Sequence, residues 1–143
     1  MKVEIKNEMI PLITEFVAEL PLVRKHSRHR RELIKMLSEQ YKKVDEQRIE
    51  IVKDYCEKDD KGKPIMKGET VQIPDENMKK YLEDVAELKN EVYVIEGGNS
   101  RELIRTMRTI LLKFEDQEYQ GKDSTTYDYL CEQFKVDENE EDE

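Results

Sequence analysis

No glycine or proline interrupts the interval from Ser27 to Cys56, and this continuity constrains the fold more than any other feature of the sequence. Apolar residues recur through the interval at spacings of three and four, which is the period of one helix face. Ser27 is a residue type that caps helix N-termini, so one long helix is expected from Ser27 to about Cys56. Arg48 interrupts the apolar seam and argues against a long coiled coil. The apolar positions are Leu33, Ile34, Leu37, Tyr41, Val44, Ile51, Val52 and Tyr55.

Four shorter helices are expected outside that interval. Each of the four segments combines an apolar face with a residue suited to the N-cap position. The first of these helices ends at Pro21, because proline cannot continue a helix. The expected cap residues are Asn7, Asp75, Asn99 and Ser124.

Three parts of the sequence favour β structure. Lys2 to Lys6 alternates apolar and charged residues, and Val92 to Ile95 is a compact β-branched and aromatic run. Between Glu57 and Pro74, the short runs Pro64 to Met66 and Thr70 to Ile73 flank a turn and predict a small hairpin. Together these patterns predict a mainly helical α+β fold with about five helices, one of them long, and one or two small β elements.

The negative charge of the chain is concentrated at its C-terminal end. Of the 143 residues, 41% are charged and 36% are hydrophobic, and the formal net charge is -9. Six carboxylates and no cation lie between Asp137 and Glu143, so residues 1–136 carry a net charge of about -3. A segment without apolar residues cannot contribute to a core. We therefore expect a single domain over residues 1–136 and a disordered acidic tail over residues 137–143.

No part of the sequence resembles a membrane span, which needs about 20 apolar residues. Met1 to Leu20 lacks the basic start and the uninterrupted apolar stretch of a signal peptide. Cys56 and Cys131 lie far apart in a chain without a secretory signal, so two free thiols are expected rather than a disulfide. We expect a cytoplasmic protein without membrane association.

The sequence contains no catalytic signature, so we expect a protein that is not an enzyme and holds no cofactor or metal. A Cys–His nucleophile would need Cys56 or Cys131 beside a histidine, but both cysteines lie at or beside apolar helix faces, where Cys acts as a small hydrophobe. His26 and His29 are surrounded by five cations and lack a third ligand, which disfavours a metal. Gly97 to Ser100 is most simply a helix-capping turn.

The most specific feature is a cluster of cations between Arg24 and Arg31, a segment without any acidic residue. The helix dipole disfavours each cation near a helix N-terminus by about 0.3–1 kcal/mol, so an anion is expected opposite the cluster. Three anions compete: internal carboxylates such as Glu15 and Glu19, the acidic tail of the same chain, or an external partner. The six residues predicted to bind a partner are Arg24, Lys25, Arg28, His29, Arg30 and Arg31.

A second group of basic residues follows Asn99. Arg101, Arg105 and Arg108 share the polar side of the helix expected there. We interpret this stripe as a solvated helix face.

Four segments carry a family resemblance, and they follow one another along nearly the whole chain. They are Ser27 to Arg30, Tyr55 to Pro64, Glu87 to Gly97 and Tyr127 to Glu132. In these segments the chain resembles a family of small phage and prophage proteins from Gram-positive bacteria, catalogued as a domain of unknown function. The resemblance implies a phage or prophage origin and expression in the cytoplasm of the host bacterium. It carries no known activity, and no functional residues can be transferred from it.

Three functions fit these features. The first is a small non-enzymatic phage or prophage accessory protein that acts by protein–protein interaction, in virion morphogenesis or on the host. The second is a nucleic-acid-mimicking inhibitor of a host nuclease or defence system, suggested by the net charge of -9. The third is a nucleic-acid binder that uses Arg24 to Arg31. We expect a phage or host protein as partner ahead of nucleic acid, and the sequence leaves the oligomeric state open.

Overall fold

The computed structural model describes residues 1–138 and divides the chain into two compact units. Unit 1 consists of Met1–Tyr41 together with the residues from Val92 onward, and unit 2 is Lys42–Glu91. The prediction of a single domain over residues 1–136 stays a prediction.

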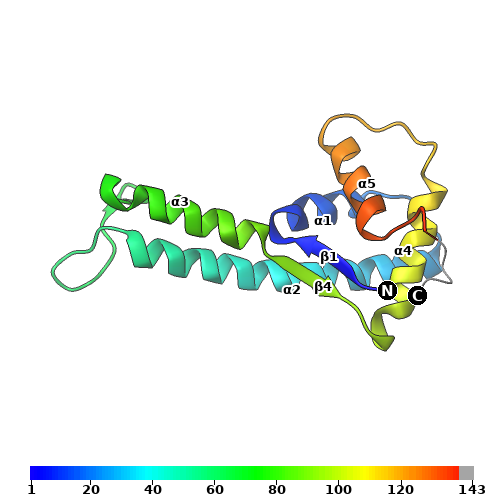
Figure 1. The fold of residues 1–143 in the computed structure, drawn as a ribbon, viewed down its shortest axis with the longest axis horizontal. Coiled ribbons are helices and arrows are strands. Elements are labelled where there is room, and N and C mark those ends of the chain that lie inside the picture. Colours follow the sequence, from blue (N-terminus) through cyan, green and yellow to red (C-terminus); the bar gives the residue numbers. More distant parts are fainter. Residues whose placement is uncertain (139–143) are drawn as a thin grey trace. The chain divides into compact units, whose positions relative to one another are not determined.

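The sheet of unit 1 joins two strands that are far apart in the sequence. β1 (Val3–Lys6) and β4 (Val92–Ile95) pair antiparallel, with Val3 opposite Ile95 (Figure 1). Val3 and Ile5 on β1 are fully buried, as the alternation of apolar and charged residues in this strand requires. Both strands are confirmed at their predicted positions.

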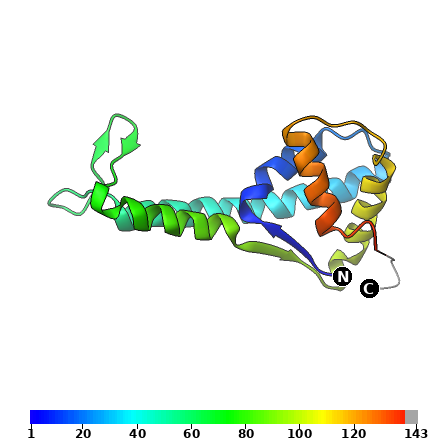
Figure 2. The same ribbon diagram turned by 45° about the horizontal axis from the view of Figure 1, so that its top comes forward.

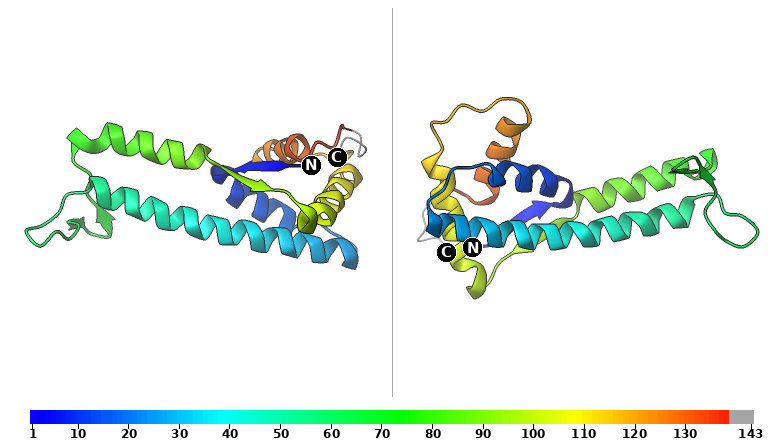
Figure 3. Two further views of the ribbon diagram at one scale, coloured as in Figure 1. Left: turned by 60° about the horizontal axis from the view of Figure 1, so that its bottom comes forward. Right: turned by 180° about the vertical axis from the view of Figure 1, so that it is seen from behind.

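Three helices pack with this sheet and with the first part of a fourth helix, α2 (Arg24–Tyr55), to complete unit 1. They are α1 (Ile10–Ala18), α4 (Arg101–Lys113) and α5 (Lys122–Gln133). Helix α1 packs against α5, and α5 also contacts α4 and β1 (Figure 3). The buried apolar residues of α4 share one face of the helix, since Leu103, Met107 and Ile110 follow one another at spacings of four and three. The core consists of Val3, Ile5, Ile10, Ile13, Phe16, Val17, Leu20, Leu33, Leu37, Ile95, Leu103, Ile104, Met107, Ile110, Leu111, Leu130 and Phe134.

The long helix predicted from the uninterrupted interval is α2 (Arg24–Tyr55), whose first part belongs to unit 1 and whose second part belongs to unit 2. The predicted start at Ser27 is wrong, because the backbone N–H of Ser27 already donates to the carbonyl of Val23 at 2.9 Å. Pro21 lies before this start, so nothing in the sequence prevents the helix from beginning earlier. The whole basic cluster is therefore helical.

Unit 2 contains the second part of α2, a small hairpin and α3 (Asp75–Asn90). Strands β2 (Met66–Lys67) and β3 (Thr70–Val71) pair antiparallel around a turn at Gly68, where a φ of +67° favours glycine (Figure 2). The hairpin confirms the predicted β element, with strands shorter than expected. The buried hydrophobic residues of unit 2 are Val44, Cys56 and Leu88.

Two hydrogen bonds join α2 to α3 within unit 2. The Tyr55 hydroxyl donates to Asp84 Oδ2 at 2.6 Å, and Asn77 Nδ2 donates to the carbonyl of Tyr55 at 2.9 Å. The bond to Asp84 is the main cause of a raised Tyr55 pKa. These two bonds add polar contacts to the few buried side chains of unit 2.

Two residues predicted as N-caps lie in short 3-10 helices that precede α1 and α4. Asn7 lies in η1 (Asn7–Met9), and its Oδ1 accepts a hydrogen bond from Gln40 Nε2 at 3.2 Å, while α1 begins at Ile10. Asn99 lies in η2 (Gly98–Ser100), immediately before α4. In both places the helix begins later than the cap residue alone predicts.

The start of α5 also differs from the prediction. The helix begins at Lys122, before the expected cap Ser124, and the residue that precedes it is Gly121 with a φ of +58°. Glycine adopts this left-handed conformation without strain, so the chain can reverse there and enter the helix early. Leu130 in this helix is fully buried.

The chain after α5 forms a turn that reaches Glu138. The backbone N–H of Glu138 donates to the carbonyl of Lys135 at 3.0 Å. Asp137 and Glu138, the first residues of the predicted tail, belong to this turn, and residues 139–143 lie outside the described residues. The mainly helical α+β fold is confirmed, and within residues 1–138 every helix is too short or too polar to cross a bilayer.

Candidate functional site

The helical period divides the basic cluster into an exposed side and an inner side. Arg24, Arg28 and Arg31 follow one another at spacings of four and three, so they form one exposed stripe along α2. Lys35 continues the stripe, and Lys25 lies beside it. We call these five side chains the basic surface. The sequence interpretation missed Lys35, although its spacing of four from Arg31 within the expected helix indicated that it continues the stripe.

Arg30 faces inward and closes the end of α1. Its guanidinium donates to the carbonyl oxygens of Val17 at 3.2 Å, Ala18 at 3.4 Å and Leu20, and to the Ser27 hydroxyl at 3.3 Å. The last carbonyls of a helix lack intrahelical donors and carry the negative end of the helix dipole. The partial negative charges of these carbonyl oxygens stabilise the Arg30 cation. The sequence interpretation had considered carboxylates as its partners.

His29 also points into unit 1. Its Nδ1 lies 2.6 Å from the hydroxyl of Thr106, so this hydrogen bond connects α2 to α4. Because His29 and Arg30 both make contacts inside unit 1, we leave these two predicted partner-binding residues out of the basic surface. Within residues 1–138, no group of three His, Cys, Asp or Glu side chains lies close enough together to hold a metal ion.

The exposed cations have no carboxylate partner in the described part of the chain. None of the ion pairs found within residues 1–138 includes a residue of the basic surface. Glu15, one of the carboxylates considered as an internal partner, instead pairs with Lys122 at 3.2 Å. The helix dipole disfavours positive charge at the N-terminal end of α2, where the basic surface begins. Its side chains therefore remain available for an external anion.

Arg108 corrects the interpretation of the second basic stripe. Its side chain is 2% exposed, and its Nη2 donates to the backbone carbonyls of Lys135 at 3.0 Å and Glu138. Arg101 is exposed, and Arg105 pairs with Glu102 at 3.2 Å. The stripe is therefore a solvated face only in part, because Arg108 anchors the turn that follows α5.

Neither cysteine has the environment of an activated nucleophile. Burial raises the pKa of the Cys131 thiol, which lowers its thiolate fraction at neutral pH. Cys56 is buried, and its Sγ lies 3.7 Å from the carbonyl of Lys53, as a weak donor. Both thiols are free, as the sequence predicted.

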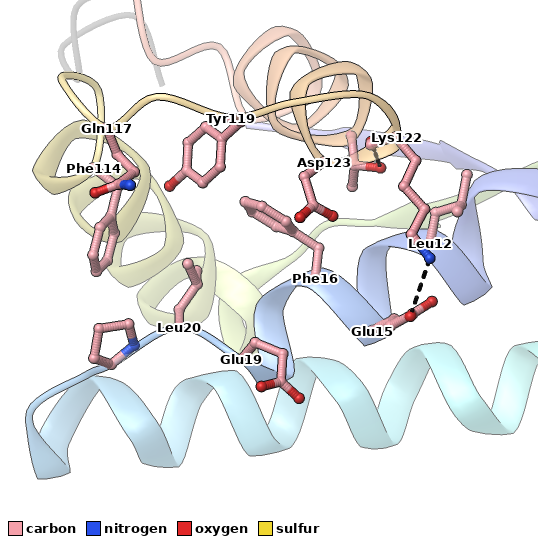
Figure 4. Close-up of a pocket in the computed structure, with 12 residues that line it drawn as sticks. Leu12, Glu15, Phe16, Glu19, Leu20, Phe114, Gln117, Tyr119, Lys122 and Asp123 are labelled. Atoms are coloured by element: carbon pink, nitrogen blue, oxygen red, sulfur yellow. Dashed lines mark hydrogen bonds and ion pairs between the residues drawn. The ribbon is translucent and has the colours of Figure 1, made fainter.

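A cavity of about 470 Å³ lies in unit 1, between α1, the turn that follows α1, and the segment that joins α4 to α5 (Figure 4). The sequence interpretation did not find this cavity, because its walls come from segments far apart in the chain. The only signals were apolar or aromatic residues outside the main helix faces, such as Leu12 and Tyr119. The lining residues are Leu12, Glu15, Phe16, Glu19, Leu20, Pro21, Phe114, Gln117, Tyr119, Lys122, Asp123 and Thr126.

Comparison with known proteins gives no relative from which a role can be transferred. No family model, curated protein or solved structure matches the chain.

Proposed function

We propose that the protein is a non-enzymatic binding protein that contacts an acidic partner protein through the basic surface. The observation that carries this proposal is the exposed stripe Arg24, Arg28 and Arg31 at the N-terminal end of α2, without a carboxylate partner within residues 1–138. Arginine suits such a contact, because its planar guanidinium binds a carboxylate through two parallel hydrogen bonds. The resemblance to phage and prophage proteins supports an accessory role in virion morphogenesis or in interaction with the host, in the host cytoplasm.

The charge distribution favours a protein partner over nucleic acid. Residues 1–41 and 92–136 contain equal numbers of basic and acidic side chains, so the excess of about three negative charges in residues 1–136 lies in unit 2. Binding to a phosphate backbone depends on a surplus of Lys and Arg that releases counterions. A chain with a net charge of -9 repels a polyanion at long range, whereas a short acidic patch on a protein needs only the local cations.

Charge neutralisation tests the proposal. A variant that combines Arg24→Gln, Lys25→Gln, Arg28→Gln and Arg31→Gln removes four cations of the basic surface. Affinity capture after nuclease treatment, from bacteria that express the phage genes, would compare this variant with the wild type. We expect at least a tenfold loss of the captured phage or host protein.

A matched control removes four exposed cations from unit 2, by the changes Lys42→Gln, Lys43→Gln, Lys79→Gln and Lys80→Gln. The control should retain the partner. Equal loss in both variants would show a general charge effect, and an undiminished capture by the first variant would contradict the basic surface as the contact. A gel shift of nucleic acid at low salt by the wild type, abolished in the first variant, would favour nucleic-acid binding instead.

A second candidate function is inhibition by nucleic-acid mimicry, which the acidity of unit 2 favours. A shallow groove there is lined by five carboxylates and one lysine: Lys43, Glu46, Glu50, Asp84, Glu87 and Glu91. Carboxylates along a helix pair present charges that a basic nuclease groove can bind in place of phosphates. Changing Glu46, Glu50, Glu87 and Glu91 to Gln would weaken a complex of this kind, and deletion of residues 137–143 would measure the contribution of the tail.

A further inference from the structure

The cavity of unit 1 has the dimensions and the lining of a small-molecule site. Its volume of about 470 Å³ lies within the range of about 300–1,000 Å³ that is typical of ligand pockets. Half of its twelve lining residues are apolar or aromatic, and they come from three segments: Leu12, Phe16, Leu20, Pro21, Phe114 and Tyr119. A few polar groups at defined positions in such a wall are the usual determinants of ligand orientation.

Tyr119 supplies one of these polar groups. Its hydroxyl is buried and has no hydrogen-bond partner among the described residues, and Figure 4 shows it directed into the space beside Phe114 and Leu20. A buried hydroxyl without a hydrogen-bond partner destabilises the folded state, because it has lost its hydrogen bonds to water. The ring is held in place by two aromatic neighbours. It makes an edge contact with the Phe16 ring, with 5.3 Å between the ring centroids, and it stacks on the Tyr127 ring, with 4.9 Å between the centroids. This fixed hydroxyl suits a polar group of a bound molecule.

The charged groups of the cavity are mainly acidic. Lys122 pairs with Glu15 at 3.2 Å, so these two charges offset each other. Glu19 and Asp123 have no ion pair within residues 1–138, and Figure 4 shows the Asp123 carboxylate projecting toward the Phe16 ring. The negative charge of Asp123 also contributes to the raised pKa of Tyr119, after burial and the nearby Cys131. Carboxylates and aromatic faces together attract an organic cation.

The walls of the cavity are fixed by hydrogen bonds inside unit 1. Arg30 holds the carbonyl of Leu20 at one side, and the Thr126 hydroxyl donates to the carbonyl of Lys122 at 2.7 Å at the other. A site that is already ordered loses less conformational entropy when it binds.

We infer that this cavity binds a small organic cation, a protonated amine carried on an apolar or aromatic body. The apolar body contacts Phe16, Leu20 and Phe114, and the ammonium group approaches the Asp123 carboxylate and the Tyr119 hydroxyl. The lining of the cavity contains no residue of the basic surface, so ligand binding and partner binding use different parts of unit 1.

Three probes of nearly equal size test the inference: 4-phenylbutylamine, 4-phenylbutanol and 4-phenylbutyrate. Amide resonances of isotope-labelled protein would be followed during titration with each probe. We expect the amine to bind at least tenfold more tightly than the alcohol, a difference of about 1.4 kcal/mol, and the carboxylate to bind most weakly. The shifted resonances should be those of the lining residues. Equal affinity for all three probes, or no shift of lining residues by the amine, would overturn the inference.

Two variants separate charge recognition from apolar contact. Asp123→Asn should weaken binding of the amine about tenfold and leave binding of the alcohol unchanged, because only the amine is charged. Glu118→Gln, which removes an exposed carboxylate of the same segment outside the cavity lining, should leave both affinities unchanged. The inference fails if Asp123→Asn weakens both probes equally, or if Glu118→Gln has the same effect as Asp123→Asn. Circular dichroism would confirm that each variant is folded.

Discussion

Unit 1 and unit 2 are both built from amphipathic helices and short strands, but they bury very different amounts of apolar surface. The core of unit 1 draws on β1, β4 and four helices and includes many side chains with no exposed area. The buried hydrophobic residues of unit 2 are Val44, Cys56 and Leu88, and each of them keeps 6–8% of its area exposed. Its exposed large hydrophobic residues are Ile49, Ile65, Met66, Met78 and Leu82. Since apolar burial dominates folding, unit 1 should determine the stability of the protein.

The units also differ in their charges. Unit 1 without the residues from Asp137 onward has no net charge, yet it contains both the basic surface and the acidic cavity. Unit 2 has a small excess of carboxylates spread over its helices. The net charge of this part of unit 1 is therefore zero although it contains two regions of opposite charge. Sites that require fixed geometry are expected on the part of the fold that is most densely packed.

The largest difference should appear when one side chain is truncated in each unit. Ile110→Ala removes a side chain with no exposed area from unit 1 and should lower the free energy of unfolding by about 2–5 kcal/mol. Leu82→Ala truncates a side chain of unit 2 that is 57% exposed, and the effect should stay within about 0.5 kcal/mol. Chemical denaturation measures both. A similar loss for the two variants would show that Leu82 is covered by a contact outside this structure.

The second effect concerns Arg30 and its neighbour Arg31. Arg30→Met keeps an unbranched apolar stem but removes the donors to the carbonyls of Val17, Ala18 and Leu20, and the expected loss is about 2 kcal/mol. Arg31→Met changes an exposed arginine on the same helix and should alter stability by less than about 0.5 kcal/mol. If the two variants were equally stable, Arg30 would belong to the basic surface after all, and the contact with α1 would be incidental.

A third effect appears only at alkaline pH, and most of the tyrosines that cause it lie in unit 1, with Tyr55 as the one in unit 2. Burial raises the pKa of Tyr119, Tyr127 and Tyr129 above the ordinary value of 10.0. Below pH 10.0 these groups are protonated in both states, so they do not change stability. Above it the unfolded chain releases the protons and the folded chain retains them, so stability falls with rising pH.

Melting temperatures between pH 8 and about pH 11 measure this effect. Tyr127→Phe removes one of the raised groups, so its melting temperature should fall less steeply above pH 10.0 than that of the wild type. Tyr41→Phe, which changes a tyrosine that is 41% exposed, should follow the wild-type curve. Parallel curves for the wild type and Tyr127→Phe would exclude Tyr127 as a cause of alkaline destabilisation.

The elements could be predicted from the sequence to a large extent, because helix and strand periods are visible in the spacing of apolar residues. The starts of helices were less predictable. An N-cap residue contributes about 1 kcal/mol, which is too little to fix where a helix starts. Helix α2 begins at Arg24, before Ser27, and α5 begins at Lys122, directly after Gly121 and before Ser124. The pairing of β1 with β4 could not be predicted from the sequence either. Alternation of apolar and polar residues identifies a strand but does not show which strand pairs with it.

The candidate site shows the same limit. The cluster from Arg24 to Arg31 was visible as composition, but its division into exposed and inward residues depended on where α2 begins. Arg108 looked like a solvated cation, because sequence spacing places it on the polar side of α4 and gives no sign of the turn that covers it. The cavity was not predictable at all, because its lining comes from residues that only the tertiary fold brings together.

The smallest effect tests whether the two units unfold together. Tyr55→Phe removes the hydroxyl that donates to Asp84 in unit 2, and Tyr129→Phe removes the hydroxyl that accepts from the backbone N–H of Lys6 in unit 1. Hydrogen exchange of backbone amides measures the response of each region. Because unit 2 has few buried side chains, Tyr55→Phe should accelerate exchange in Lys42–Glu91 alone, and Tyr129→Phe should leave exchange in that segment unchanged. Acceleration by Tyr55→Phe throughout the chain would instead show that the units unfold cooperatively, as a single domain over residues 1–136 requires.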